Sequence, residues 1–469
     1  MGAVLARLLS PDVFGLTAIG FLVVAFAGYF VKLWVGPALI QKEQITNDDI
    51  SFAFSFSLTI GFIAFGIVFL LSPLIASLFN KPESAKVIAA LSLLLWITSF
   101  SASINSLLKR NMQFKLISIV GIAQTLIAGI LSVTMSILGL GVWSLIWPLI
   151  ISQILGIIVL FYFIRQSHSI KFSFSFSGHG DLLKFGSKFT LVSLLEYFGS
   201  NLDTIFIGRF FSLNQLGIYN RAFKLAYLPS ENLITSITSV MFPVFSRLQN
   251  QIEEFKETQK RLFVFIGLIS TCIAMGMVPA SKDIILVLLG PQWGNSIPIL
   301  EVVLFAVPFD FMAVTIGLTF DAAGKLNERI KIQVASLLIL ILSILLLNSY
   351  GPIGIAAALV ISHFVRFMYY FISNKHFRSI SVKSIFQNLA SISISGVITF
   401  VACFFAVHSC ATWGLSPIQS LFFEILICSL VFAVLLFLNS PILLGVKNFR
   451  QSTEEIRRFL TSKRGKQNE

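Results

Sequence analysis

The sequence predicts an all-α polytopic membrane protein, and three features support this: an apolar composition, a series of long hydrophobic segments and an internal repeat. Of its 469 residues, 56% are hydrophobic and only 12% are charged, which is about half the charged share of soluble domains. A soluble globule has too little interior to bury so much apolar surface, whereas a bilayer accepts it. The 48 phenylalanines suit contact with acyl chains.

The hydrophobic segments follow one another along the whole chain with short connections. A membrane-spanning helix needs roughly 20 mostly apolar residues, and thirteen segments meet that requirement. Several are longer than a bilayer requires, so we expect tilt or extension into water. The segments are 14–35, 52–79, 85–108, 116–138, 141–164, 188–208, 216–246, 262–289, 295–320, 331–349, 352–373, 386–408 and 418–438.

The basic residues predict the orientation of these segments. Cytoplasmic loops carry an excess of Lys and Arg. One alternating set of connections, together with the C-terminal tail, contains 25 of the 34 basic residues, and the opposite set contains five. The C-terminus is therefore predicted to be cytoplasmic. The net charge of +13 reflects this topology and does not indicate a nucleic-acid partner.

The beginning of the chain fits this orientation poorly. With a cytoplasmic tail, thirteen spans place Met1 outside the cytoplasm. The first segment is too long for a signal peptide, follows Asp12 and lacks an A-x-A cleavage site. Residues 1–9 resemble the end of a helix, so we expect a further helix upstream and fourteen helices in the complete protein.

The chain also repeats itself. ARLLSPDVFGLTA at 6–18 and GRFFSLNQLGIYN at 208–220 align at a constant offset of 202 residues. Both copies lead into a long apolar helix in the same predicted orientation, so the repeat is parallel, with a pseudo-two-fold axis along the membrane normal. Transporters of this kind place substrate between the halves. The identical pairs are Arg7 and Arg209, Ser10 and Ser212, and Gly15 and Gly217.

The repeat predicts two pseudo-symmetric helical lobes around a central cleft. The N-terminal lobe is residues 1–165, with most of its first helix missing, and a cytoplasmic loop follows at 166–187. The C-terminal lobe is 188–378. Two additional membrane helices lie within 379–440, and 441–469 form a basic cytoplasmic tail, which we expect near anionic lipid.

Several of these stretches resemble one family. ARLLSPDVFGLTAIGFLVVAFAGYF and GPALIQKEQIT in the first half, and NLDTIFIGRFFSLNQLGIYNRAFKLAYLP, MFPVFSRLQ and LLGPQWGNSIPIL in the second, resemble polysaccharide exporters of the Wzx type, the O-antigen flippases. The resemblance runs from Ala6 to about Phe377. Their superfamily, called MOP, also contains lipid II flippases and multidrug extruders. The missing first helix is the main departure from the family pattern.

The resemblance implies a V-shaped, two-lobed transporter in the bacterial cytoplasmic (inner) membrane. It implies movement of undecaprenyl-pyrophosphate-linked sugar repeats to the periplasmic face, for lipopolysaccharide, capsule or exopolysaccharide, by alternating access of the lobes. The expected partners are the lipid-linked oligosaccharide and membrane lipids, and a polysaccharide polymerase and a chain-length regulator are considered as well. No cofactor is expected.

Basic residues inside the apolar segments suggest how such a cargo is held. Charges at mid-bilayer usually face a partner or a wet cavity, and a pyrophosphate is anionic. Arg221 and Lys224 are three residues apart and share a helix face. We hypothesise that these two, with Lys32 and Arg366, line the cleft. The alternative is that Lys32 and Arg366 extend to the membrane interface, and that Arg221 and Lys224 lie near the outer boundary.

Two acidic residues, Asp203 and Asp310, are candidates for coupling transport to protons or sodium. For Asp203, a structural pairing with a neighbouring helix or with Arg209 is the alternative. The four cysteines match no zinc or CxxC spacing, and His168 and His179, eleven residues apart, do not predict a metal site.

Two other classes of function compete with the flippase. A small-molecule or drug antiporter like the MATE transporters would share the fold and would favour an acidic cavity. The charges inside the segments do not decide between the two, and the family motifs favour the flippase. A membrane polymerase or ligase is disfavoured, because the outer loops are short and no nucleophile–base pair, metal motif or phosphate loop is present.

Overall fold

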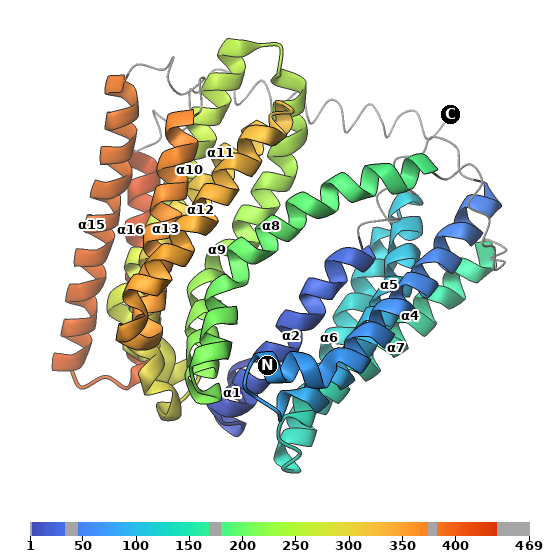
Figure 1. Ribbon diagram of the computed structural model, residues 1–469. Coiled ribbons are helices and arrows are strands. Elements are labelled where there is room, and N and C mark those ends of the chain that lie inside the picture. Colours follow the sequence, from blue (N-terminus) through green and yellow to red (C-terminus); the bar gives the residue numbers. More distant parts are fainter. Residues whose placement is uncertain (1, 33–45, 168–179, 374–381, 439–469) are drawn as a thin grey trace. The chain divides into compact units, whose positions relative to one another are not determined.

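The computed structural model describes residues 2–32, 46–167, 180–373 and 382–438, and every regular element in these ranges is helical (Figure 1). Each of the thirteen predicted segments corresponds to one long helix, so the all-α prediction is confirmed. The long helices are α2 (Pro11–Lys32), α4 (Asn47–Leu78), α5 (Ser84–Arg110), α6 (Phe114–Ile137), α7 (Trp143–Ser167), α8 (Gly180–Phe210), α9 (Leu213–Leu248), α10 (Ile252–Leu288), α11 (Ile297–Ala322), α12 (Leu326–Leu347), α13 (Gly351–Ser373), α15 (Val382–Thr412) and α16 (Pro417–Leu438).

Shorter elements connect or precede these helices. A seven-residue helix, α1 (Gly2–Leu8), precedes α2, and single 3-10 turns occupy Pro291–Ser296 and Asn348–Tyr350. Helix α4 begins with a capping box, in which Thr46 and Asp49 satisfy each other's backbone N–H groups. These short connections let consecutive long helices run antiparallel.

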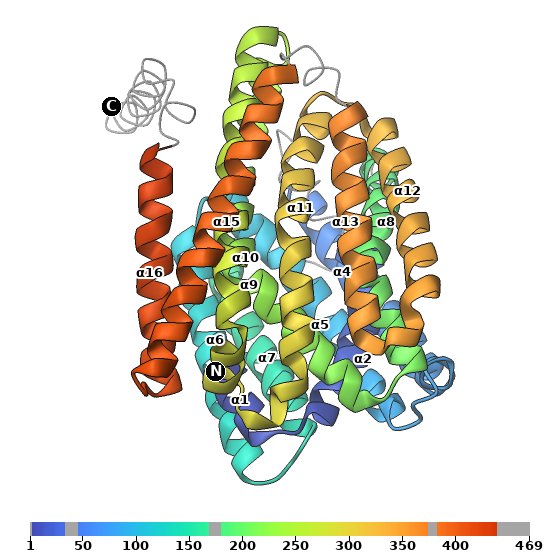
Figure 2. The same ribbon diagram turned by 90° about the vertical axis from the view of Figure 1, so that its left-hand side faces the viewer.

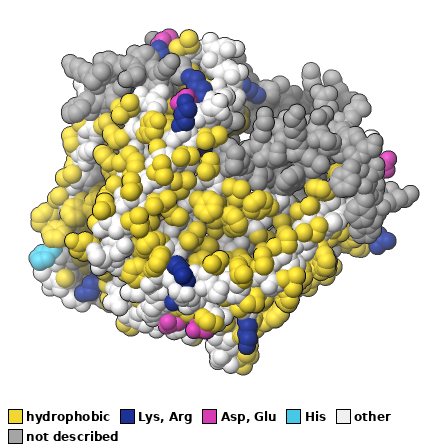
Figure 3. Space-filling view, viewed as in Figure 1, with side chains coloured by type: hydrophobic (Ala, Val, Ile, Leu, Met, Phe, Trp, Pro, Cys, Tyr) yellow, Lys and Arg dark blue, Asp and Glu magenta, His cyan; other side chains and the backbone are white. Residues whose placement is uncertain are grey.

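The surface of the helices is apolar, as expected where lipid is the solvent. Ten stretches of the described chain are long and apolar enough to cross a membrane, and one of them, Asn327–Ser373, contains both α12 and α13. Leu70 on α4 and Phe437 on α16 are 76% and 78% exposed. In the described part of the face in Figure 3, hydrophobic side chains form a broad middle band, and most charged side chains lie above and below it. The polytopic membrane fold is therefore confirmed.

The described helices divide into two compact units. Unit 1 comprises Met1–Ala222, Leu288–Ile299 and Leu340–Ala358, and unit 2 comprises Phe223–Val287, Leu300–Ile339 and Leu359–Glu469. Helix α9 therefore contributes its first part to unit 1 and the rest to unit 2. The lobe limits predicted from the repeat stay a prediction.

Each unit has its own apolar core. In unit 1, Ile104 and Leu107 of α5 are fully buried in a cluster that also includes side chains of α4, α6 and α7. In unit 2, Val264 of α10, Ile316 of α11 and Phe367 of α13 form a similar cluster. Burial of such side chains contributes roughly 1.5–3 kcal/mol each when the alternative is water.

The two copies of the repeat contact each other within unit 1. A Cβ atom added to Gly15 would lie 2.0 Å from the carbonyl oxygen of Leu213, and one added to Gly217 would lie 1.9 Å from that of Pro11. Pro11 and Leu213 are themselves 202 residues apart, so the contact is reciprocal. Helices α2 and α9 thus cross at a local two-fold arrangement, which supports the internal repeat. Only glycine permits so close an approach.

Candidate functional site

The cation of the candidate site with the most distinctive surroundings is Arg221 on α9. Its guanidinium carbon lies 3.8 Å from the centroid of the Phe14 ring on α2. Phe14 is held in place by an edge-to-face contact with Trp293, with the ring centroids 5.4 Å apart. The indole N–H of Trp293 donates to the carbonyl oxygen of Ala6 at 2.8 Å. Two residues of the first repeat copy, Ala6 and Phe14, therefore help to position Arg221.

Arg221 is held by an aromatic face and not by a carboxylate. Its Nε is buried and has no hydrogen-bond partner, and the ion pairs of the described residues do not include it. A cation–π contact orients a guanidinium without using its N–H groups. Arg221 can therefore still donate to an anion.

The other basic candidates differ from Arg221. Lys224 lies one turn further along α9 and is exposed. Lys32 is the last residue of α2, and its side chain lies outside the described residues. The shared helix face of Arg221 and Lys224 follows from their spacing.

Arg366 and Asp310, predicted separately for different roles, form an ion pair inside unit 2. Arg366 Nη2 on α13 donates to Asp310 Oδ1 on α11, and both side chains are more than four-fifths buried. Nearby, the Tyr227 hydroxyl and His363 Nδ1 are 3.3 Å apart. The cluster thus combines α9, α11 and α13. Nothing in the sequence pointed to Tyr227 or His363, because their partners are far away along the chain.

Asp203 is buried in unit 1 and is bound by its neighbours. It is 1% exposed. The Tyr219 hydroxyl of α9 donates to its Oδ2 at 2.5 Å, and the Thr204 N–H donates to its Oδ1 at 2.7 Å. Arg209 instead donates to the Ser77 carbonyl oxygen at 3.3 Å. Of the alternatives raised for Asp203, the pairing with a neighbouring helix is the one observed.

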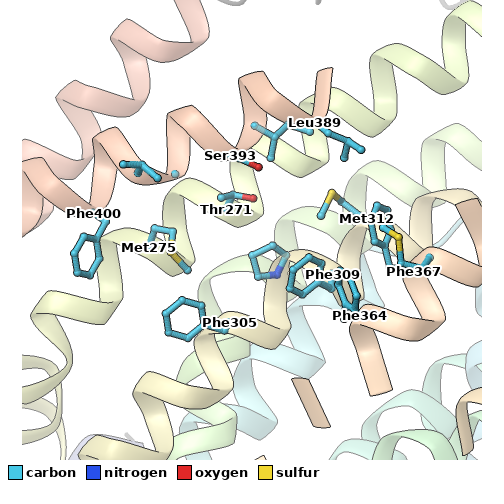
Figure 4. A pocket seen from close by; sticks show the side chains of 15 residues that line it. Thr271, Met275, Phe305, Phe309, Met312, Phe364, Phe367, Leu389, Ser393 and Phe400 are labelled. Atoms are coloured by element: carbon cyan, nitrogen blue, oxygen red, sulfur yellow. The ribbon is translucent and has the colours of Figure 1, made fainter. Parts of the chain in front are cut away.

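An apolar cavity of about 590 Å³ lies in unit 2, between α10, α11, α13 and α15. Aromatic rings and methionines point into it from these helices (Figure 4). Its few polar groups include the hydroxyls of Thr271 and Ser393. Such a lining suits a hydrocarbon chain and offers nothing to a charged ligand. The labelled lining residues are Thr271, Met275, Phe305, Phe309, Met312, Phe364, Phe367, Leu389, Ser393 and Phe400.

The described part of the chain contains no group of three His, Cys, Asp or Glu side chains that could hold a metal ion. The four cysteines are free thiols. His168 and His179 lie outside the described residues.

Comparisons with known sequences agree on one family. A family model described as "Polysaccharide biosynthesis protein" matches residues 4–298. The lipopolysaccharide biosynthesis protein WzxC of Escherichia coli is 26% identical over 361 residues, which are 75% of this chain and 72% of that protein.

Two further relatives are covered less completely. The teichuronic acid biosynthesis protein TuaB of Bacillus subtilis is 25% identical over 59% of this chain and 57% of its own length. The succinoglycan biosynthesis transport protein ExoT of Rhizobium meliloti is 24% identical over 63% of this chain and 60% of its own length. The matched part of the chain thus spans less than two thirds of these two relatives.

Solved structures share the fold. The lipid II flippase MurJ, in an inward closed conformation, has a TM-score of 0.75 and 18% identity, over 94% of this chain and 96% of that one. An inward-facing multidrug resistance MATE transporter of the MOP superfamily has a TM-score of 0.62 and 15% identity, over 81% and 94%. At these identities, the likeness concerns the fold alone.

Proposed function

The chain belongs to the polysaccharide biosynthesis protein family, and we propose that it is a flippase for lipid-linked oligosaccharide. Its cargo is an oligosaccharide repeat unit on undecaprenyl pyrophosphate, carried from the cytoplasmic to the outer leaflet of the bacterial inner membrane. The exported units serve lipopolysaccharide, capsule or exopolysaccharide synthesis. The family match over 4–298 is the observation that carries this proposal.

The relatives and the fold support transport over catalysis. ExoT is named a succinoglycan biosynthesis transport protein. MurJ, whose fold this chain shares, is a lipid II flippase. We therefore propose a transporter and not a glycan polymerase or ligase.

Arg221 is the proposed contact for the pyrophosphate. A charged phosphate that enters the apolar zone loses hydration, and a cation with free donors offsets that cost. The planar guanidinium can donate two parallel hydrogen bonds to phosphate oxygens. The Phe14 ring already contacts one face of the Arg221 guanidinium. The Arg221 side chain therefore loses little further conformational entropy when the anion binds. Lys224, one turn away, adds a second positive charge.

Arg366 and Lys32 are weaker candidates for this contact. Arg366 already pairs with Asp310, so binding a phosphate would require exchange of one anion for another. Lys32 is proposed from its position in the first helix of the repeat. The coupling role of Asp203 and Asp310 likewise stays a proposal, and both carboxylates have partners of their own.

The apolar cavity of unit 2 is the proposed location of part of the lipid chain. A polyprenyl chain is apolar and flexible, and the cavity presents aromatic rings and thioethers with few polar groups. Met side chains adapt to irregular apolar shapes. We propose alternating access as the cycle, a cytoplasmic C-terminus, and functional association with a polymerase and a chain-length regulator.

Deletion of the gene in its native bacterium tests this function. The restored strain carries the full reading frame, and surface polysaccharide and lipid-linked repeat units are both measured. Loss of polymer with repeat units held on the cytoplasmic face, reversed by the gene, is the expected result. A strain with normal glycan would contradict the proposal.

A MATE-like small-molecule antiporter is the second candidate. The TM-score of 0.62 to a MATE transporter favours it, but that likeness concerns the fold alone. Normal glycan together with altered sensitivity to small toxic compounds in the deletion strain would support the antiporter in place of the flippase.

A further inference from the structure

A separate group of polar side chains lies in unit 2, where α10, α15 and α16 lie side by side (Figure 2). Asp283 is near the end of α10, and Ser420 and Glu424 occupy the first two turns of α16. Asp283 is half-buried, and Glu424 is only 2% exposed. No function was predicted for any of the three from the sequence.

The hydroxyl of Ser420 contacts both carboxyl groups. Its Oγ lies 2.7 Å from Asp283 Oδ2 and 2.7 Å from Glu424 Oε1. Each of these hydrogen-bond distances requires one hydrogen atom between the oxygens. A serine hydroxyl has a single hydrogen, and ionised carboxylates have none. The two contacts therefore need one hydrogen more than Ser420 supplies, and one of the carboxyl groups must carry it.

Of the two acids, Glu424 is the one that we expect to be protonated. Its second oxygen, Oε2, is buried and has no hydrogen-bond partner. A buried, unpaired oxygen costs much more when it belongs to a carboxylate than when it is the carbonyl oxygen of a neutral acid. Asp283 is half-buried whereas Glu424 is 2% exposed, so a hydrogen on Glu424 removes the charge from the more deeply buried of the two groups.

Among the residues that the structure describes, no cation pairs with either acid. The ion pairs of the described residues include neither Asp283 nor Glu424. Lys282 on α10 is exposed and makes no ion pair with Asp283. The thiol of Cys403 on α15 lies near Glu424, and it is itself close to the thiols of Cys428 on α16 and Cys272 on α10. Thiols are weak donors and acceptors, so they do not replace the missing hydrogen.

We propose that Glu424, Ser420 and Asp283 form a proton-binding site. In the loaded site, the Oε1–H group of neutral Glu424 donates to Ser420 Oγ, and the Ser420 hydroxyl donates to ionised Asp283. The proton leaves along the same chain: the Ser420 hydrogen moves to Asp283 while the Glu424 hydrogen moves to Ser420. Glu424 then carries the negative charge, Asp283 is neutral, and no atom is gained or lost before Asp283 releases its proton.

In this proposal, Asp283 is the acid through which the proton enters. It is the least buried of the two acids, and it lies five residues before the end of α10. In the predicted orientation this end of α10 faces the outside, so protons would enter from the periplasmic side. The coupling of that proton to export rests on the proposed function, whereas occupancy of the site does not.

Infrared spectroscopy of the purified full-length protein at neutral pH tests occupancy. The wild-type protein should show the carbonyl band of a protonated, buried carboxyl group, and Glu424→Gln should abolish it. Glu301→Gln is the matched control, because Ser281 of α10 donates to Glu301 at 2.8 Å and this single contact needs no extra hydrogen. The control should leave the band unchanged.

Several results would overturn the proton site: no band in the wild-type protein, a band that persists in Glu424→Gln, or a band removed by sodium chloride but not by potassium chloride. The last result would mean that the site takes sodium. Export measured in parallel separates this proposal from the proposed function. A band without export contradicts only the flippase, and export without a wild-type band contradicts only the proton site.

Discussion

At the scale of single residues, Arg221 combines a fixed position with unused hydrogen-bond donors. The Phe14 ring holds its guanidinium, and no carboxylate of the described residues neutralises it. Arg221 is partly buried, and its Nε is buried without a hydrogen-bond partner, so a guanidinium that contacts a ring is consistent with an anion that arrives and leaves. Its sequence position suggested a cation in the cleft, but the aromatic contact became apparent only from the structure.

Replacement of Arg221 tests this assignment. One hydrogen bond to a charged group contributes about 1.5–3 kcal/mol, so Arg221→Ala should lower the export rate by roughly one to two orders of magnitude. Arg221→Lys keeps the positive charge but lacks the planar guanidinium, so its export rate should lie between those of the wild-type protein and Arg221→Ala. Lys86→Ala, which removes an exposed cation of the same half, is the control. Wild-type export by Arg221→Ala, at equal amounts of membrane protein, would contradict the assignment.

The Tyr219 hydroxyl donates a hydrogen bond to Oδ2 of the buried Asp203. Tyr219→Phe leaves one carboxylate oxygen unsatisfied, which costs about 1–3 kcal/mol. We expect Tyr219→Phe and Asp203→Asn each to lower the melting temperature of the purified protein, and the double variant to lose less than their sum. If Asp203→Asn abolishes export while the melting temperature is unchanged, Asp203 has the coupling role and not a structural one.

The Asp310–Arg366 pair predicts a strong double-mutant interaction. Removing one member of a buried pair costs about 3–5 kcal/mol, because the other charge stays buried without its partner. Asp310→Asn and Arg366→Gln should each destabilise unit 2, and the double variant should recover part of the loss in denaturant unfolding. The exposed Lys331–Glu328 pair is the control, and Lys331→Gln should change stability by less than about 1 kcal/mol. Additive losses for Asp310 and Arg366 would contradict the pairing.

At the scale of elements, the crossing of α2 and α9 depends on two glycines related by the repeat. Glycine in a helix is usually less stable than alanine by about 1 kcal/mol. Here the methyl group of an alanine would lie 2.0 Å or less from a backbone carbonyl oxygen of the other helix. The two helices would have to move apart to relieve this clash. Asn214 of α9 also donates to Asp12 of α2 at 3.1 Å, and these residues are again 202 apart.

Alanine substitutions test this crossing. Gly15→Ala and Gly217→Ala should each destabilise the purified protein by roughly 1–3 kcal/mol, as overpacking does. Because the contact is reciprocal, the two losses should be similar. Gly66→Ala and Gly121→Ala are matched controls, since a Cβ atom at either helical position meets nothing within 4 Å. Equal melting temperatures for all four variants would contradict a close crossing.

The elements were largely predictable from the sequence, and their lateral contacts were not. Long apolar segments such as 52–79 and 418–438 predict α4 and α16, because length and hydropathy alone decide whether a helix can cross a bilayer. The pairing of Asp310 with Arg366 depends on which faces of α11 and α13 meet, and hydropathy does not encode that. Similarly, the repeat aligned Gly15 with Gly217 without showing that the two copies touch.

At the scale of the whole molecule, family, fold and composition agree on a multi-pass transporter. The long, apolar helices explain the low charge content, and the fold matches that of a lipid II flippase over most of both chains. Among the described residues, unit 1 contains an arginine without a carboxylate partner. Unit 2 contains an apolar cavity. The arginine suits an anion, and the cavity suits a hydrocarbon chain.

Reconstitution of the purified full-length protein tests whether it moves lipid-linked oligosaccharide between leaflets. Vesicles carry a polyprenyl-pyrophosphate-linked oligosaccharide, and a membrane-impermeant sugar-oxidising reagent measures how much of it is exposed on the outer leaflet. Wild-type protein should bring the protected inner-leaflet fraction within reach of the reagent, while Arg221→Ala protein should do so much more slowly. A protected fraction equal to that of protein-free vesicles, with folded protein present, would contradict the claim.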